Sequence, residues 1–263
     1  MNKKALINNY NDLGYISKIK IISENEALNH RMILEKTEKK IGNLHYKSKV
    51  HTILKSPYEL AINNKILDIV ELFIGPNILL HNVTYIIKEA KSLSYVSWHQ
   101  DLTYWGFSGD EQISVWLALS PTTKKSGCMQ MIPGSHKVGK FKHEKTKDSN
   151  NVLISGQTVK NIDENQSIYC SLQPGEASFH HGWILHKSNP NNSNDRRIGL
   201  NIQYLATHVK QLKHNKDSAI CVRGVDKFKN FLADKPAIKD LSSNAVKNFY
   251  NMDAIYKKTQ QMN

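Results

Sequence analysis

Two residues that could ligate a metal ion, His99 and Asp101, stand two positions apart in this chain. They lie in residues 96–102, whose composition predicts a β-strand. Because strand side chains alternate between faces, we expect the imidazole and the carboxylate to point the same way. A distant second imidazole, at His186, would complete the two-histidine, one-carboxylate ligand set of non-haem Fe(II) oxygenases. That set leaves coordination positions open for a co-substrate and dioxygen, so it predicts a reaction class and not a substrate.

The spacing of the first pair is weak evidence alone, because a chain with 12 histidines produces a His-x-Asp pair by chance. Its surroundings strengthen the hypothesis, since the segment from Trp98 to Trp105 is rich in aromatic residues suited to lining a pocket. His186 ends a later strand-like run, residues 179–186. His180 and His181 belong to the same run and are rival third ligands.

Arginine is rare in this lysine-rich chain, and two of the four arginines are adjacent. The four are Arg31, Arg196, Arg197 and Arg223. Arginine offers a permanently charged planar fork that binds a carboxylate through two parallel hydrogen bonds, which lysine cannot do. Arg197 opens a predicted strand soon after His186. If it faces inward, then Gly199, Asn201 and Gln203 share its face and form a polar pocket wall.

The elements that must position these residues are mainly short strands. The strands are expected at residues 15–22, 78–87, 95–102, 113–119, 128–132, 167–172, 176–181 and 198–205, with an outer strand at 219–222. Strands of this length, separated by turn residues, predict a closed barrel or a double-sheet jelly roll. We therefore predict one mainly β domain with flanking helices over residues 1–263: a helical part at about 1–75, a jelly-roll core at about 76–225 and a C-terminal helix.

Three helices are predicted around this core. Ser23 and Glu26 form a capping box that opens a helix reaching about residue 40. A second helix covers residues 64–73 and stops at Gly75. The third covers residues 243–261, with Val246, Phe249 and Tyr250 on its inner side.

The composition favours a cytoplasmic protein that binds neither nucleic acid nor a membrane. The net charge is +13, but the lysines are scattered and no run of five or six basic residues occurs. The three cysteines, at wide and unpatterned spacing, fit reduced thiols better than disulfides or a zinc site. No apolar run is long enough for a signal peptide or a membrane span. We expect a small-molecule partner, and the sequence gives no oligomeric state.

Several motifs occur in the order found in one known family. They run from Trp98 to Gly106, from Val115 to Leu119, through Ile132-Pro-Gly-Ser-His136, and from His181 to Leu200. Together they resemble the phytanoyl-CoA dioxygenase family of Fe(II)- and 2-oxoglutarate-dependent oxygenases, which fold as a double-stranded β-helix of cupin-like type. The resemblance covers about residues 10–231 and is strongest over 98–205.

The resemblance implies roles for individual residues. It makes His99, Asp101 and His186 the iron ligands, because the family's third ligand precedes the arginine by the spacing that selects His186. Arg197 and Ser188 would bind the far carboxylate of 2-oxoglutarate, and Trp116 would line the co-substrate site. Related halogenating enzymes carry a small residue in place of the carboxylate ligand, so Asp101 implies hydroxylation or a related oxidation and not chlorination.

Substrate contacts are less defined. The candidates are Tyr104, Trp105, Asn82, Thr84, Lys88, Asn201 and Gln203. We expect a dioxygenase that uses Fe(II), 2-oxoglutarate and O2 to hydroxylate a small polar metabolite, releasing succinate and CO2. One alternative is a cupin-type metal-binding jelly roll that does not use 2-oxoglutarate, such as an isomerase or a sensor. Another is an oxygenase that modifies nucleic acid or protein, and only the net charge supports this alternative.

Overall fold

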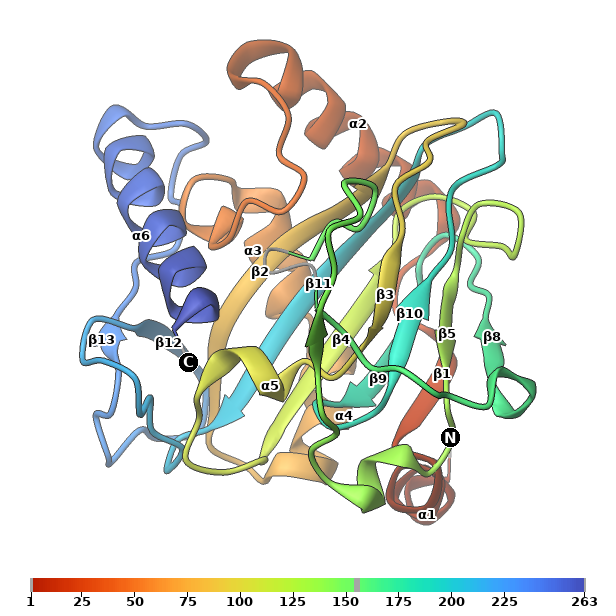
Figure 1. The fold of residues 1–263 in the computed structure, drawn as a ribbon. Coiled ribbons are helices and arrows are strands. Elements are labelled where there is room, and N and C mark those ends of the chain that lie inside the picture. Colours follow the sequence, from red (N-terminus) through yellow and green to blue (C-terminus); the bar gives the residue numbers. More distant parts are fainter. Residues whose placement is uncertain (1, 154–156, 263) are drawn as a thin grey trace.

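The fold is built on two β-sheets packed as layers (Figure 1). The computed structural model describes residues 2–153 and 157–262. The larger sheet has seven strands in the order β1-β9-β4-β11-β2-β12-β13, and the smaller has four in the order β3-β10-β5-β8. The predicted double-sheet arrangement is confirmed, and neither sheet closes into a barrel.

The element boundaries agree with most of the predicted strands. The helices are α1 (Lys3–Leu13), α2 (Glu24–Ile41), α3 (Lys55–Ala61), α4 (Asn64–Ile74), α5 (Leu102–Trp105) and α6 (Ser243–Gln261), with short 3-10 turns η1 (Val50–Thr52), η2 (Ser135–Val138) and η3 (Glu164–Gln166). The strands are β1 (Tyr15–Lys20), β2 (Ile78–Lys88), β3 (Val96–His99), β4 (Gln112–Ala118), β5 (Met129–Met131), β6 (Glu144–Lys145), β7 (Gln157–Thr158), β8 (Ile168–Cys170), β9 (Glu176–His181), β10 (His186–Ser188), β11 (Arg197–Ala206), β12 (Ser218–Arg223) and β13 (Leu232–Ala233).

Strand alternation separates the two faces of the large sheet. In β11, the core shared with the helices contains Ile198, Leu200, Ile202 and Tyr204. The intervening residues Arg197, Asn201 and Gln203 line a cavity on the opposite face. The period of two therefore gives this strand an apolar side against the helices and a polar side toward the small sheet.

A β-bulge in β2 keeps the same division. Gln203 of β11 pairs with Asn82, whereas the next residue, Tyr204, pairs with Leu80. His81 is thus the extra residue, and it reverses the alternation along β2. As a result Asn82 faces the cavity while Leu80 still packs in the core with the helices.

The helical layer is larger than the sequence predicted. The capping box at Ser23 and Glu26 is present, and α2 and α4 lie where expected. The expectation of only two helices before the jelly roll was wrong, because α1 and α3 also form. Asn2 caps α1 by accepting hydrogen bonds from two backbone N–H groups, and Pro57 sits in the first turn of α3, where its missing N–H costs little.

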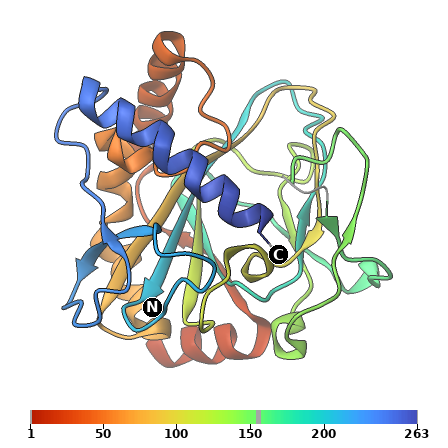
Figure 2. The same cartoon turned by 60° about the vertical axis from the view of Figure 1, so that its left-hand side comes forward.

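The C-terminal helix α6 has the predicted bounds but a different inner face. Phe249 is buried and packs against the main core, whereas Tyr250 is 48% exposed, so its placement on the inner side was wrong. Tyr256 is the second buried aromatic residue of α6. Figure 2 shows α6 crossing in front of the large sheet with its C-terminal end beside α5. Within the described ranges, no helix is long and apolar enough to cross a membrane.

Candidate active site

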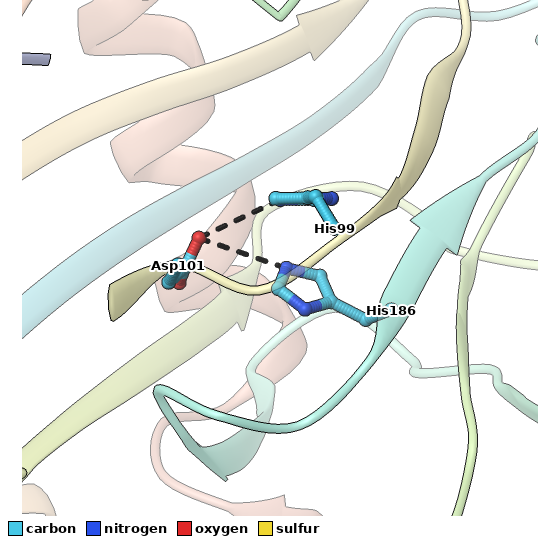
Figure 3. A group of neighbouring side chains, drawn as sticks. All are labelled: His99, Asp101 and His186. Carbon is cyan, nitrogen blue, oxygen red and sulfur yellow. Dashed lines mark ion pairs between the residues drawn. The ribbon is translucent and has the colours of Figure 1, made fainter. Parts of the chain in front are cut away.

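The three candidate metal ligands converge at one place in the small sheet. β3 and β10 pair antiparallel with His99 opposite His186, so the two imidazoles are neighbours with ring centroids 4.0 Å apart. The Nε2 atoms of His99 and His186 lie 3.5 and 3.8 Å from Oδ1 of Asp101 (Figure 3). One ligand atom from each residue lies within 4.8 Å of the others, which is the geometry of a metal site.

Asp101 reaches this site by a different route from the one predicted. β3 ends at His99, and Asp101 has helical backbone angles at the start of α5. The expectation that both residues share a strand face was therefore wrong. The chain leaves the sheet at Gln100, whose buried side-chain amide donates hydrogen bonds to the carbonyl groups of Gly139 and Trp183. The turn, and not strand alternation, brings the carboxylate back toward His99.

Both ligand histidines are oriented by the backbone. Nδ1 of His99 lies 2.9 Å from the carbonyl oxygen of Ser97, and Nδ1 of His186 lies 3.0 Å from that of Ile184. A carbonyl accepts only, so each Nδ1 carries a proton and Nε2 is the nitrogen that each ring turns toward Asp101. Burial, followed by the neighbouring His99, lowers the pKa of His186 to about 3, which keeps this imidazole neutral.

Asp101 is held as a carboxylate. Burial alone would raise its pKa, but His180 and His99 interact with it and hold the pKa well below its usual range. The Ser114 hydroxyl also donates a hydrogen bond to Oδ2 at 3.2 Å. An anionic oxygen beside two imidazole nitrogens is a donor set suited to a divalent transition metal.

The rival histidines point in different directions. His180 is buried, and its Nε2 lies 3.6 Å from Oδ2 of Asp101, outside the cluster formed by the other three residues. His181 faces the other side of β9, where its Nδ1 accepts a hydrogen bond from the N–H of Trp183. Nε2 of His136 lies 3.1 Å from the carbonyl oxygen of Asn11, and this residue is not part of the cluster. The geometry thus favours His186 as the third ligand.

Arg197 is buried in the same cavity with part of its guanidinium unpaired. Nη1 donates a hydrogen bond to the carbonyl of Gly127 at 2.8 Å, but Nε and Nη2 have no partner among the described residues. Burial lowers the pKa of Arg197 to about 10, so it is still protonated at neutral pH. The guanidinium lies 5.2 Å from the ring centre of Trp116, and Ser188 lines the same cavity. A buried cation with two unpaired N–H groups in one plane fits a bidentate carboxylate ligand.

Lys88 lies beside this arginine and is not among the residues that line the cavity. Its Nζ atom donates hydrogen bonds to the carbonyl oxygens of Ser188 and Asn189, at 3.0 Å for Ser188. Burial and then the charge of Arg197 lower the pKa of Lys88 to about 6. Its hydrogen bonds support the loop that follows Ser188.

Comparison with known proteins identifies the family. A family model described as phytanoyl-CoA dioxygenase matches residues 20–199, a span that contains the three ligands and Arg197. The chain belongs to the phytanoyl-CoA dioxygenase family. It is 31% identical over 149 residues to a "probable alpha-ketoglutarate-dependent hypophosphite dioxygenase" of Stutzerimonas stutzeri, covering 56% of this chain and 52% of that protein. It is 28% identical over 145 residues to the peroxisomal phytanoyl-CoA dioxygenase of Homo sapiens, covering 53% and 43%. The chain thus spans about half the length of these curated relatives.

Solved structures agree with the family assignment. The apo form of ThoJ, described as a non-heme monooxygenase, has a TM-score of 0.85 at 26% identity and covers 97% of each chain. A structure of CytC3 with Fe(II) and alpha-ketoglutarate has a TM-score of 0.68 at 20% identity, covering 91% of this chain and 97% of that one. The second likeness shows the fold.

Beyond the ligands, the cavity of this phytanoyl-CoA dioxygenase family member brings together most of the predicted substrate contacts. Six of the seven line it: Tyr104, Trp105, Asn82, Thr84, Asn201 and Gln203. The Tyr104 hydroxyl and Oδ1 of Asn201 are buried without a hydrogen-bond partner among the described residues. These two atoms are available to a polar ligand, because buried polar groups are normally paired.

Sequence reasoning missed the part of the wall that comes from outside the jelly roll. The missed residues outside the jelly roll include Tyr46, Ser48, Tyr256, Lys257 and Gln260. The last three belong to α6, whose buried positions follow the period of a helix from Phe249 to Asp253 and Tyr256. Continuing that period along the sequence would have found Tyr256.

Gly199 gives a stability prediction, because a Cβ at this position would overlap ring atoms of Trp116. We expect Gly199→Ala to lower the free energy of unfolding by about 1–3 kcal/mol through overpacking. Denaturant unfolding measures the change. Gly109→Ala is the control, since its Cβ meets the end of the flexible Glu111 side chain. Equal stability of the two variants would contradict the prediction.

Proposed function

We propose that this protein is an Fe(II)- and 2-oxoglutarate-dependent dioxygenase that hydroxylates a small polar metabolite and releases succinate and CO2. The observation that carries the proposal is the position of Arg197, which offers two unpaired N–H groups in the same cavity as His99, Asp101 and His186. The family and the name of the Stutzerimonas stutzeri relative, which specifies alpha-ketoglutarate, support it.

The residues present fit both groups. His99, Asp101 and His186 would hold the iron, since two neutral imidazoles and one carboxylate suit Fe(II) and leave other positions free. Nε and Nη2 of Arg197 would hold the far carboxylate of 2-oxoglutarate, with Ser188 beside them. When bound, iron and 2-oxoglutarate supply the activation of dioxygen that amino-acid side chains cannot provide.

The remaining contribution of the protein is orientation and exclusion of water. The carbonyl groups of Ser97 and Ile184 fix the two imidazole rings, so a metal ion meets lone pairs that need no rearrangement. Trp116 covers the guanidinium of Arg197 and limits solvent at the co-substrate end. The position of the carboxylate ligand is occupied by Asp101, and this supports oxygen insertion over halogenation.

The size and lining of the cavity favour a small polar substrate. The cavity has a volume of about 130 Å³, in which on the order of ten water molecules fit. Asn82, Thr84, Asn201 and Gln203 contribute amides and a hydroxyl to a wall that otherwise includes many apolar and aromatic side chains. With 2-oxoglutarate bound near Arg197, a substrate would approach from the side of α6.

Anaerobic addition of Fe(II) and 2-oxoglutarate tests the proposed function. We expect a visible metal-to-ligand charge-transfer band in the wild-type protein and its loss in His99→Ala. His208→Ala, which changes a half-exposed histidine that does not line the cavity, should keep the band. A well-folded wild-type protein without the band would rule out 2-oxoglutarate chemistry and leave the metal-binding jelly roll.

A jelly roll that does not use 2-oxoglutarate would have no ligand to pair with the guanidinium of Arg197. A buried guanidinium with unpaired N–H groups is costly unless a ligand pairs with it. Oxygenation of a nucleic acid is supported by net charge alone, and salt-sensitive binding to DNA or RNA would be its sign.

A further inference from the structure

The substrate side of the cavity is closed by a helix that lies outside the family match. Tyr256, Lys257 and Gln260 of α6 line the cavity, whereas the family model ends at residue 199. Tyr256 packs in a cluster with Leu102 and Tyr104, which follow Asp101 in the chain. Figure 2 shows the same approach of α6 to α5. This wall therefore lies outside the span that the family model matches.

Side-chain contacts fix α6 in this position. The Tyr256 hydroxyl donates a hydrogen bond to Oε1 of Gln203 on β11 at 3.0 Å. The ammonium of Lys213 donates to the carbonyl groups of Tyr104 and Thr259, each at 3.0 Å, and so joins α5 to the last turn of α6. A wall tied to the strand of Arg197 and to the turn after Asp101 is positioned to select what reaches the iron.

The charge on this wall is positive. Asp253 of α6 is 6% exposed and is shared by two lysines, with Lys257 at 2.8 Å and Lys47 at 3.8 Å. The backbone N–H of Ser48 donates a hydrogen bond to Oδ1 of Asp253 at 2.9 Å. One carboxylate therefore faces two ammonium groups, and the three side chains together have a net charge of about +1. Lys257 lines the cavity and is 35% exposed, so it retains donors for a ligand.

The rest of the lining adds no competing anion. Asp101, a metal ligand, is the one carboxylate among the lining residues that the structure describes. The other lining lysine, Lys187, is paired with Glu164 at 2.6 Å. Among the described lining residues, the substrate side therefore adds no carboxylate beyond the metal site to repel an anion.

We propose that Lys257 is a specificity-determining residue that binds an anionic group of the substrate, with the amide hydrogens of Gln203 beside it. Oε1 of Gln203 accepts the hydrogen bond from Tyr256, so the Nε2 group of Gln203 remains to donate to other partners. The inference rests on the proposed function and deepens it, because it assigns the substrate to the class of small anions such as carboxylates and phosphonates.

The test uses the full-length protein loaded with Mn(II) and saturating 2-oxoglutarate. Methylphosphonate is the anionic probe and tetramethylammonium the cationic one, and paramagnetic relaxation of their methyl protons reports binding near the metal. We expect relaxation of methylphosphonate and none of tetramethylammonium. Lys257→Gln should weaken methylphosphonate binding by about fivefold, the size of a partly exposed charge pair. Lys257→Arg should restore it, and Lys247→Gln, on an exposed part of α6, should leave it unchanged.

Two kinds of failure are distinguishable. Absence of the Fe(II)–2-oxoglutarate band overturns the proposed function. A normal band with no methylphosphonate relaxation in the wild type, or with equal relaxation in Lys257→Gln, overturns the role of Lys257 alone. Relaxation that disappears as 2-oxoglutarate reaches saturation would place the anion at Arg197 and also overturn it. The comparison of the two probes on the wild type holds even if Lys257→Gln does not fold.

Discussion

Arg197→Ala is expected to raise the dissociation constant for 2-oxoglutarate by at least about 100-fold while Fe(II) binding is retained. Nε and Nη2 of the guanidinium have no partner among the residues that the structure describes, and each charge-assisted hydrogen bond contributes about 1.5–3 kcal/mol. Two such bonds correspond to on the order of 100-fold or more in affinity. Anaerobic titration of the charge-transfer band with 2-oxoglutarate measures the effect, and Mn(II) binding measured by calorimetry reports the metal site.

The adjacent arginine supplies a matched control. Arg196 is partly buried outside the cavity and pairs with Glu38 and Glu89, each at 2.9 Å. Arg196→Ala should change the affinity for 2-oxoglutarate less than about twofold, because this guanidinium does not line the cavity. Arg197→Lys should not restore binding, since an ammonium group lacks the planar fork. An unchanged titration in Arg197→Ala would contradict the assignment of this arginine.

The second large effect is expected at Asp101. Asp101→Ala removes the one carboxylate of the metal cluster and should weaken Fe(II) or Mn(II) binding by more than about 100-fold. This bound follows because even residues that only orient the ligands change metal affinity by about 10–100-fold when substituted. The variant should therefore also lose 2-oxoglutarate-dependent succinate formation.

Calorimetric titration with Mn(II) measures this loss directly. Asp110→Ala is the control, since Asp110 is an exposed carboxylate near His181 and does not line the cavity. It should bind the metal as the wild type does. Normal metal affinity in Asp101→Ala would show that the site is built from other residues, with His180 the first to examine because it contacts Asp101.

Most of the jelly roll was predictable because its strands carry their own pattern. β9 has the predicted bounds, and β2, β4 and β11 differ by one or two residues, because buried apolar runs and turn residues delimit them locally. The geometry at Asp101 was not predictable in this way. Whether a strand continues past His99 depends on hydrogen bonds from the Gln100 side chain to the carbonyl groups of Gly139 and Trp183. Both residues are distant from Gln100 in the sequence.

The same physical reason explains the errors in the helices. Tyr250 was placed on the inner face of α6 because apolar content alone does not give the rotation of a weakly amphipathic helix. Contacts with Gln203 and Lys213 set that rotation and bring Tyr256 inward. The residues that recognise a substrate therefore depend on tertiary contacts, whereas the metal-ligand motif could be identified from residue types and order.

The pairing of His99 with His186 has a consequence for folding. Bringing position 99 next to position 186 closes a long loop, and the entropy of that closure opposes formation of the small sheet. A metal ion that binds all three ligands in the folded chain, and binds the unfolded chain weakly, stabilises the closed loop through linkage. Thermal unfolding should therefore shift to higher temperature as Mn(II) is added, and the shift should vanish in Asp101→Ala. Metal binding would thus stabilise the pairing of β3 with β10 as well as provide a site of chemistry.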